Sequence, residues 1–210
     1  MHQSQLRKPN MIHKHFLTFS SRQTALRQLS NFWESSERPF MFHQGRLFRS
    51  GEHAFHAAKF RVAAASHTSG PRQALLLAKS QTFELNGDLT VKEAKAAGGK
   101  GKTGLRLEGN EIEKWNEASF DVQIELCQAK LAQYDEVRFV LAETGDAVLV
   151  HTAFRIKDEK LAQDTMRWDG RVVDGEVIGG NRLGNAWMPV TTPWMINIRT
   201  MISDEVVVTV

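Results

Sequence analysis

Residues 50–60 read SGEHAFHAAKF, an acid, two histidines and a lysine among alanines and phenylalanines. On a helix, Glu52, His56 and Lys59 stand at i, i+4 and i+7, which is one face. Phe55 lies on the same face and alanines occupy the others, so no face of this helix is purely polar. The pattern is consistent with a solvated ion pair on a surface helix. It is equally typical of the wall of a partly dry site, where Glu52 could have a raised pKa or pair with Lys59.

The bulk composition places the chain among ordinary globular proteins. It has 210 residues, of which 41% are hydrophobic and 24% charged, with a net charge of +3 that tolerates a phosphate-bearing ligand or nucleic acid without demanding either. The single cysteine, Cys127, excludes an intrachain disulfide and is expected in the core. The basic N-terminus has no apolar signal core, and no apolar run reaches the roughly 20 residues that cross a bilayer. We therefore expect a cytoplasmic protein without a membrane partner.

The order of periodic segments predicts a single α+β domain, weighted toward helix, with a few short strands. We expect a flexible N-terminal arm over residues 1–15 and one domain over residues 16–210. The expected elements are a hairpin within 39–50, helices at 51–65, 73–78, 91–97, from 115 onward and at 136–143, loops and a hairpin within 168–185, and strands at 147–151 and in the valine-rich tail.

A glycine-lysine segment follows the third expected helix. It reads GGKGKTG over residues 98–104 and carries Lys100 and Lys102. Glycines let backbone N–H groups approach an anion and lysines supply charge, so the segment could cradle a phosphate. Its spacing does not match a Walker A loop, and a flexible solvated loop fits equally well.

Aromatic residues in polar surroundings suggest a binding surface for a planar ligand. Trp115 lies in EKWNEA and Trp168 in MRWDGR, and with Phe32 and Trp33 they predict a base-stacking site, although core or interface packing is the alternative. Asp169, beside Trp168, is a candidate to bind a ligand hydroxyl or ring nitrogen. The eight histidines show no metal-ligand spacing, so we expect neither a metal nor another cofactor.

In their order along the chain, these segments resemble the NADAR family, the NAD- and ADP-ribose-associated domain also called YbiA-like. The resemblance spans about residues 29–190. It rests on Ser30-Asn31-Phe32, the hairpin at 39–48, Glu52-His53-Ala54-Phe55 through Lys59-Phe60, Trp115 with Ala129-Lys130-Leu131, Thr144-Gly145-Asp146 before Leu149-Val150, Trp168-Asp169-Gly170, and Gly180-Asn181-Arg182-Leu183-Gly184 with Met188.

The resemblance implies a single compact, mainly helical NADAR/YbiA-like domain that acts as an N-glycosidase on a ribosylated base. Family members remove ADP-ribose from guanine in DNA or hydrolyse riboflavin-pathway intermediates. By this resemblance Glu52 is the principal catalytic acid, and Lys59 either tunes it or adds to the opened ribose C1 as a Schiff base. Trp115 and Trp168 would line the site, and Asn181 would fix the closing loop.

The complete set of expected site residues combines the resemblance with the residue patterns. The expected catalytic residues are Glu52, Lys59 and Asp169, and the expected substrate-binding residues are Asn31, Phe32, His53, Lys100, Lys102, Trp115, Trp168 and Asn181.

Two departures from the family pattern affect the site. His151 stands where many members have a glutamate, so the role of a second carboxylate passes to Asp169 or is absent. The family's Gly-Arg loop is here a segment with Lys100 and Lys102. The lysines keep the positive charge, but they lack the bidentate guanidinium of arginine.

ADP-ribosylated nucleic acid is the expected partner, together with a functional pairing to an ADP-ribosyltransferase. The alternatives are an N-glycosidase of a phosphorylated ribosyl-base precursor of riboflavin, a non-catalytic ADP-ribose-binding module, or a DNA-binding protein without catalysis.

Overall fold

The structure is a computed structural model, and it describes residues 15–99, 105–152, 156–163 and 167–190. Residues 1–14 of the expected arm, Lys100 and Lys102, and the valine-rich tail lie outside these described ranges.

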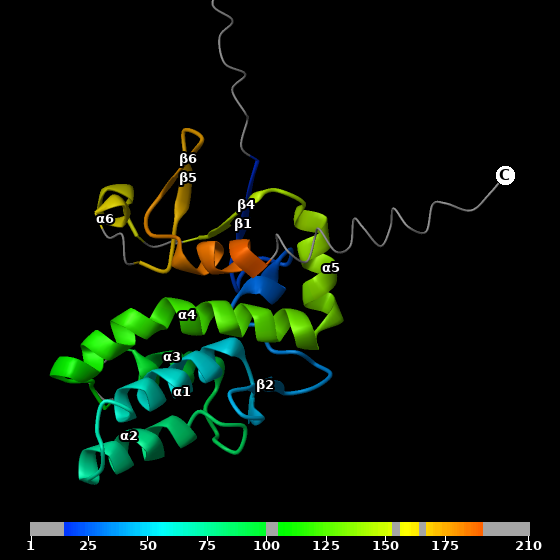
Figure 1. Cartoon of the computed structure of the whole chain (residues 1–210). Helices are drawn as coiled ribbons and strands as arrows, with labels where there is room; N and C mark the ends of the chain where they lie inside the picture. Colours follow the sequence, from blue (N-terminus) through cyan, green and yellow to red (C-terminus); the bar gives the residue numbers. More distant parts are fainter. Residues whose placement is uncertain (1–14, 100–104, 153–155, 164–166, 191–210) are drawn as a thin grey trace, which may run out of the picture.

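Helix α1, Gly51–Ala64, lies at the centre of the helical part of the protein. Helices α2 (Pro71–Gln81), α3 (Val91–Gly98) and α4 (Gly109–Gln133) all pack against it. In Figure 1, α4 crosses the middle of the protein, with α1 and α2 below it. The alanines of α1 are buried on several sides, which lets the neighbouring helices approach closely. Burial all round explains why the sequence of α1 has no polar face.

In the described ranges, the strands form three two-stranded sheets. Strand β1 (Phe16–Phe19) runs parallel to β4 (Val148–His151), and the register sets Phe19 opposite His151. The other two sheets are antiparallel hairpins: β2 (Phe40–Phe42) with β3 (Arg46–Phe48), and β5 (Arg171–Val173) with β6 (Glu176–Ile178). The parallel pair joins the start of the described chain to its second half and presents His151 at its carboxyl end.

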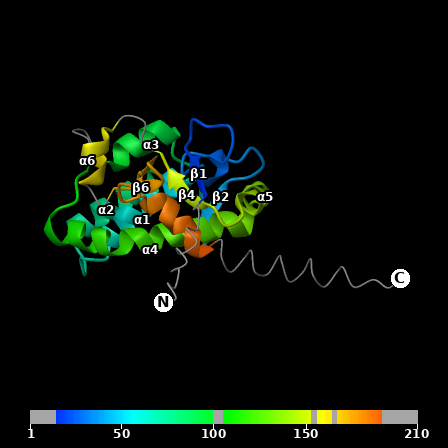
Figure 2. The ribbon, with the colours of Figure 1, turned by 90° about the horizontal axis from the view of Figure 1, so that it is seen from above.

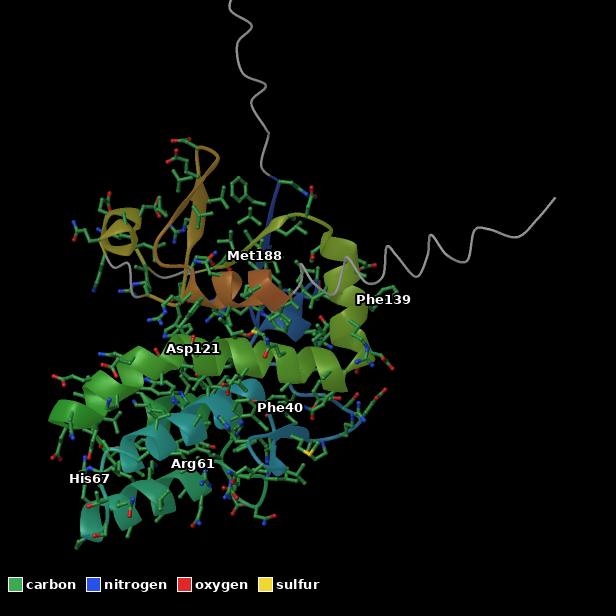
Figure 3. The ribbon with its side chains drawn as sticks, viewed as in Figure 1. Phe40, Arg61, His67, Asp121, Phe139 and Met188 are labelled. Carbon is green, nitrogen blue, oxygen red and sulfur yellow. The ribbon has the colours of Figure 1, made fainter. Side chains whose placement is uncertain are left out.

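The remaining elements lie around these helices and sheets. They are the 3₁₀ helix η1 (Arg27–Leu29), α5 (Asp135–Thr144), α6 (Asp158–Ala162) and a helix over 182–190. Seen from above, the β5–β6 hairpin lies over α1, with α4 along the lower edge of the view (Figure 2). Phe139 on α5 points away from the body of the protein and is 67% exposed (Figure 3). None of the helices in the described part of the chain is long and apolar enough to cross a membrane.

This architecture confirms the expected α+β class, mainly helical with a few short strands. Several details differ from the prediction. Helix α2 covers Pro71–Gln81 instead of 73–78. Helix α4 begins at Gly109 instead of Trp115, because Glu108 and Glu111 form a capping box there. A helix covers 182–190, and its first residues lie in the stretch up to 185 for which glycines and polar residues indicate loops and a hairpin. Strand β1 was not predicted, since its partner β4 lies far away in the sequence.

A buried lysine connects α4 to the segment that precedes Asn31. Lys130 is 1% exposed, and its Nζ donates to the carbonyl oxygens of Gln28 at 2.5 Å and Ser30 at 2.9 Å. Trp187 Nε1 donates to the intervening carbonyl of Leu29 at 3.0 Å. Burial lowers the pKa of Lys130 to about 7. Three consecutive carbonyls are therefore held in place, at the expense of burying an amine.

Lys130 makes stability depend on pH in a predictable direction. The unfolded chain keeps this lysine protonated up to about pH 10, whereas the folded protein releases its proton at about pH 7. Between these values the unfolded state binds more protons, so stability rises with pH. We expect the free energy of unfolding in urea to rise between pH 7 and 9.5 by about 3 kcal/mol more in the wild type than in Lys130→Met. Equal slopes in the two proteins would contradict this assignment, whatever their absolute stabilities.

Candidate active site

Glu52 lies in the first turn of α1 and is 8% exposed. Its backbone N–H donates to the carbonyl oxygen of Asn31 at 2.8 Å, and its Oε1 accepts from His56 Nε2 at 3.3 Å. The amino end of a helix favours negative charge, because its backbone N–H groups point outward. The carboxylate is thus buried in surroundings that compensate its charge.

Opposing effects set the pKa of Glu52. Burial raises it, whereas the hydrogen bond from His56 and the positive charges of His56, Lys95 and His151 lower it, and the resulting pKa is below the ordinary 4.5. The group is therefore ionised at neutral pH. The structure thus gives Glu52 a lowered pKa instead of the raised one that the sequence allowed, and pairs its carboxylate with His56, which the sequence analysis did not propose.

The ammonium of Lys59 binds the end of α3. Its Nζ donates to the carbonyl oxygen of Gly98 at 2.7 Å. A Cβ atom on Gly98 would overlap the ring of His56, so only glycine allows α3 to approach α1 this closely. The end of α3 therefore fixes both Lys59 and His56, and Gly98 leads directly into the segment that carries Lys100 and Lys102.

Asn31 supports α1 from the other side. Its Nδ2 donates to Gln123 Oε1 at 2.8 Å, and Gln123 Nε2 donates back to Asn31 Oδ1 at 3.1 Å. Both amides are buried, and a Cβ on Gly51 would lie 3.1 Å from Asn31 Oδ1. Asn31, expected to bind substrate, thus joins α4 to the first turn of α1.

His53 is likewise held by protein groups. Leu89 O can only accept, so His53 Nε2–H donates to it at 2.9 Å, and Nδ1 accepts from the Ser50 hydroxyl at 2.8 Å. Burial lowers the pKa of His53, in keeping with this neutral tautomer. Ser50 stands at the N-cap, as its sequence position indicates, but uses its hydroxyl for His53.

Aromatic side chains gather beside Glu52. The ring of Phe55 meets Trp115 and Trp168 edge to face, at centroid distances of 4.9 and 5.2 Å. The Arg182 guanidinium lies 4.8 Å from the Trp168 ring and 5.2 Å from that of Phe120. Both tryptophans are half-buried. The structure thus brings the predicted Trp115 and Trp168 together through Phe55.

The other predicted aromatic residues lie apart from this cluster or at its edge. Phe32 is half-buried and carries Lys95 Nζ 4.9 Å from its ring centroid. Trp33 packs edge to face against Tyr134 at 5.1 Å and beside Lys130. Trp33 therefore belongs to the surroundings of the buried lysine.

His151 and Asp169 form a hydrogen-bonded pair, with 2.9 Å between His151 Nδ1 and Asp169 Oδ1. Asn181 holds both residues: its Oδ1 accepts from the His151 N–H at 3.0 Å, and its own N–H donates to the Asp169 carbonyl oxygen at 3.0 Å. Its Nδ2 also donates to Leu149 O at 2.9 Å. A Cβ on Gly170 would lie 2.9 Å from Asn181 Cβ, so glycine is needed for this contact. Asn181 fixes the loop around Asp169.

Sequence reasoning missed several groups that act on Glu52 or lie against the aromatic cluster. His56 could have been found from its i+4 spacing, which the sequence displays directly. Lys95 and Arg182 gave no local signal, because their nearness to the site depends on how α3 and the 182–190 helix pack. His151 was visible only as a departure from the family pattern.

A family model described as the NADAR domain matches residues 13–192. The chain belongs to the NADAR family. The family includes N-glycosidases, so the coarse class of activity agrees with the resemblance seen in the sequence. Among solved structures, the NMR structure of the Escherichia coli protein YbiA matches with a TM-score of 0.54 and 22% identity, covering 89% of this chain and 88% of that one. This likeness bears on the fold alone. No curated protein matches the NADAR chain.

The close approach of Gly98 to His56 can be tested by substitution. We expect Gly98→Ala to destabilise the protein by about 1–3 kcal/mol, because the added methyl overlaps the imidazole in a packed interior. Gly99→Ala is the matched control, since its Cβ meets no side chain and approaches only the carbonyl oxygens of Lys95, at 3.0 Å, and Ala96, at 3.8 Å. Urea unfolding of both variants would measure the difference. A Gly98→Ala protein as stable as Gly99→Ala would contradict the packing described for α3.

Proposed function

We propose that this NADAR protein hydrolyses the C–N bond between a ribose and a base, and that it removes ADP-ribose from guanine in nucleic acid. The observation that carries the proposal is the buried, ionised carboxylate of Glu52 beside the cluster of Phe55, Trp115 and Trp168.

Breaking a base–ribose bond develops positive charge on the sugar. A fixed carboxylate lowers the barrier, because it stabilises this charge more strongly in the transition state than in the bound substrate. The effect is larger in a partly dry site, where the dielectric constant is lower than in water. Glu52 is placed for this task by its backbone bond to Asn31 and by His56.

The aromatic cluster supports recognition of a planar base. Stacking of a base on an aromatic side chain contributes roughly 1–3 kcal/mol and tolerates different bases. The half-buried Trp115 and Trp168 are the proposed partners of the guanine ring.

Cationic groups near the cluster support a substrate that carries phosphates. Lys95 acts electrostatically on Glu52, and Arg182 lies against Trp168. Lys100 and Lys102 follow Gly98 closely in the sequence. A pyrophosphate and a nucleic-acid strand together offer more negative charge for these residues than a single phosphate does, which favours ADP-ribosylated guanine over a riboflavin precursor. Lys59, bonded to Gly98 O, is proposed to hold the beginning of this cationic segment.

The test is turnover of an oligonucleotide that carries ADP-ribose on guanine, with release of ADP-ribose followed by chromatography and mass spectrometry. We expect Glu52→Gln to lower kcat by about 100-fold or more, because it removes the charge and keeps the shape. Glu84→Gln is the matched control, since Glu84 is ion-paired with Arg46 and Arg61 and should affect turnover little.

Each other result points to a different conclusion. Near-normal turnover by Glu52→Gln would remove Glu52 from the mechanism. Release of base from a phosphorylated riboflavin precursor, with no release of ADP-ribose from the oligonucleotide, would replace the proposed substrate. Tight binding of ADP-ribose in calorimetry, without any product over hours, would favour a binding module.

A further inference from the structure

The pair formed by His151 and Asp169 has no task in the reaction as described so far. Their hydrogen bond joins the carboxyl end of β4 to the loop before β5. Phe19 packs against the imidazole with a centroid distance of 5.2 Å, and Asn181 binds the His151 backbone. The imidazole is therefore held by the Asp169 carboxylate and the Phe19 ring, and the backbone that carries it is held by Asn181.

This pair lies on the same side of α1 as Glu52. His151 is one of the groups whose charge acts on the Glu52 carboxylate. Trp168, the residue before Asp169, packs against Phe55, which is one helical turn from Glu52. The packing of Trp168 against Phe55 thus brings the loop of Asp169 to the part of α1 that carries Glu52, and the hydrogen bond to Asp169 holds His151 to that loop.

Hydrolysis of the C–N bond requires a proton at the leaving nitrogen, because a guanine anion leaves poorly. An ionised Glu52 cannot supply that proton, although it can stabilise the sugar. A site with this carboxylate therefore needs a second group that donates.

We propose that His151 is the general acid of the site, a catalytic residue, and that Asp169 positions it. Asp169 accepts the Nδ1 proton, which leaves Nε2 as the atom that donates. The proposal rests on the proposed function, because it completes the same reaction.

The proposed step balances as follows. The C1–N bond breaks and its electron pair goes to the base nitrogen, which takes the proton from His151 Nε2. Water forms the new bond to C1 and loses a proton to the Glu52 carboxylate. Exchange with solvent removes that proton from Glu52 and returns one to His151, so the products are ADP-ribose and the strand with its guanine restored.

The chain contains a matched pair for comparison. His67 Nε2 lies 2.8 Å from Glu111 Oε1, and Arg72 also binds this carboxylate through two hydrogen bonds. His67 follows the carboxyl end of α1, opposite to the end that carries Glu52 (Figure 3). Since α1 has 14 residues, the two ends are about 20 Å apart. His67 and Glu111 thus form a histidine–carboxylate pair that lies away from the proposed site.

The experiment measures release of ADP-ribose from the guanine-modified oligonucleotide by His151→Ala and His67→Ala, with and without added imidazole. We expect the kcat of His151→Ala to be about 100-fold or more below that of the wild type. Added imidazole should raise the kcat of this variant at least tenfold. His67→Ala should keep wild-type turnover and show no response to imidazole.

A second comparison separates an acid from a residue that only shapes the site. ADP-ribose linked to 4-nitrophenol has a leaving group that departs without a proton. The loss caused by His151→Ala, or by His151→Gln if the alanine variant does not fold, should be at least tenfold smaller with this compound. Asp169→Asn should follow the same pattern with a smaller loss, because it acts through His151.

The outcomes are distinct. Turnover of His151→Ala within threefold of the wild type would overturn the proposal, and so would a loss that imidazole does not restore and that is equal for both leaving groups. A wild-type protein that releases no ADP-ribose from the oligonucleotide would instead overturn the proposed function, before any variant is compared.

Discussion

The structure depends on burying the charged first turn of α1. A carboxylate taken out of water has a large energetic cost unless nearby groups compensate it. Glu52 has its backbone N–H bonded to Asn31, a histidine one turn along, and further positive charge from Lys95 and His151. The elements that supply these groups are far apart in the sequence. The fold must therefore bring them together around one helix, and that requirement links its stability to its chemistry.

Residues that support this helix explain several polar positions. The amides of Asn31 and Gln123 satisfy each other, and His53 is held between Ser50 and Leu89. Buried polar groups with complete hydrogen bonding fix one arrangement, since any other leaves a donor or acceptor unpaired. Such residues look like ligand-binding groups in a sequence, yet here they hold the site in place. Asn181 does the same for the loop around Asp169.

The sequence was informative where the signal was local. The i, i+4, i+7 spacing predicted α1 and the shared face of Glu52 and Lys59, and the Gln44-Gly45 turn predicted the β2–β3 hairpin. It could not show that Lys59 turns to the carbonyl of Gly98, because that partner belongs to another helix. The sequence likewise could not show the parallel pairing of β1 with β4. The position of His151 depends on the register of these two strands, which are far apart in the sequence. The family resemblance supplied the order of motifs, but the pairing of His151 with Asp169 required the structure.

Glu52 is a buried carboxylate that its neighbours keep ionised. The most direct measurement is the pH titration of the Glu52 side-chain carboxyl by ¹³C NMR, with the resonance assigned by its absence in Glu52→Gln. We expect a midpoint below the ordinary 4.5, since His56, Lys95 and His151 outweigh the effect of burial. A midpoint above 4.5 would show that burial dominates, and would contradict the division of roles between a carboxylate at the sugar and an acid at the base.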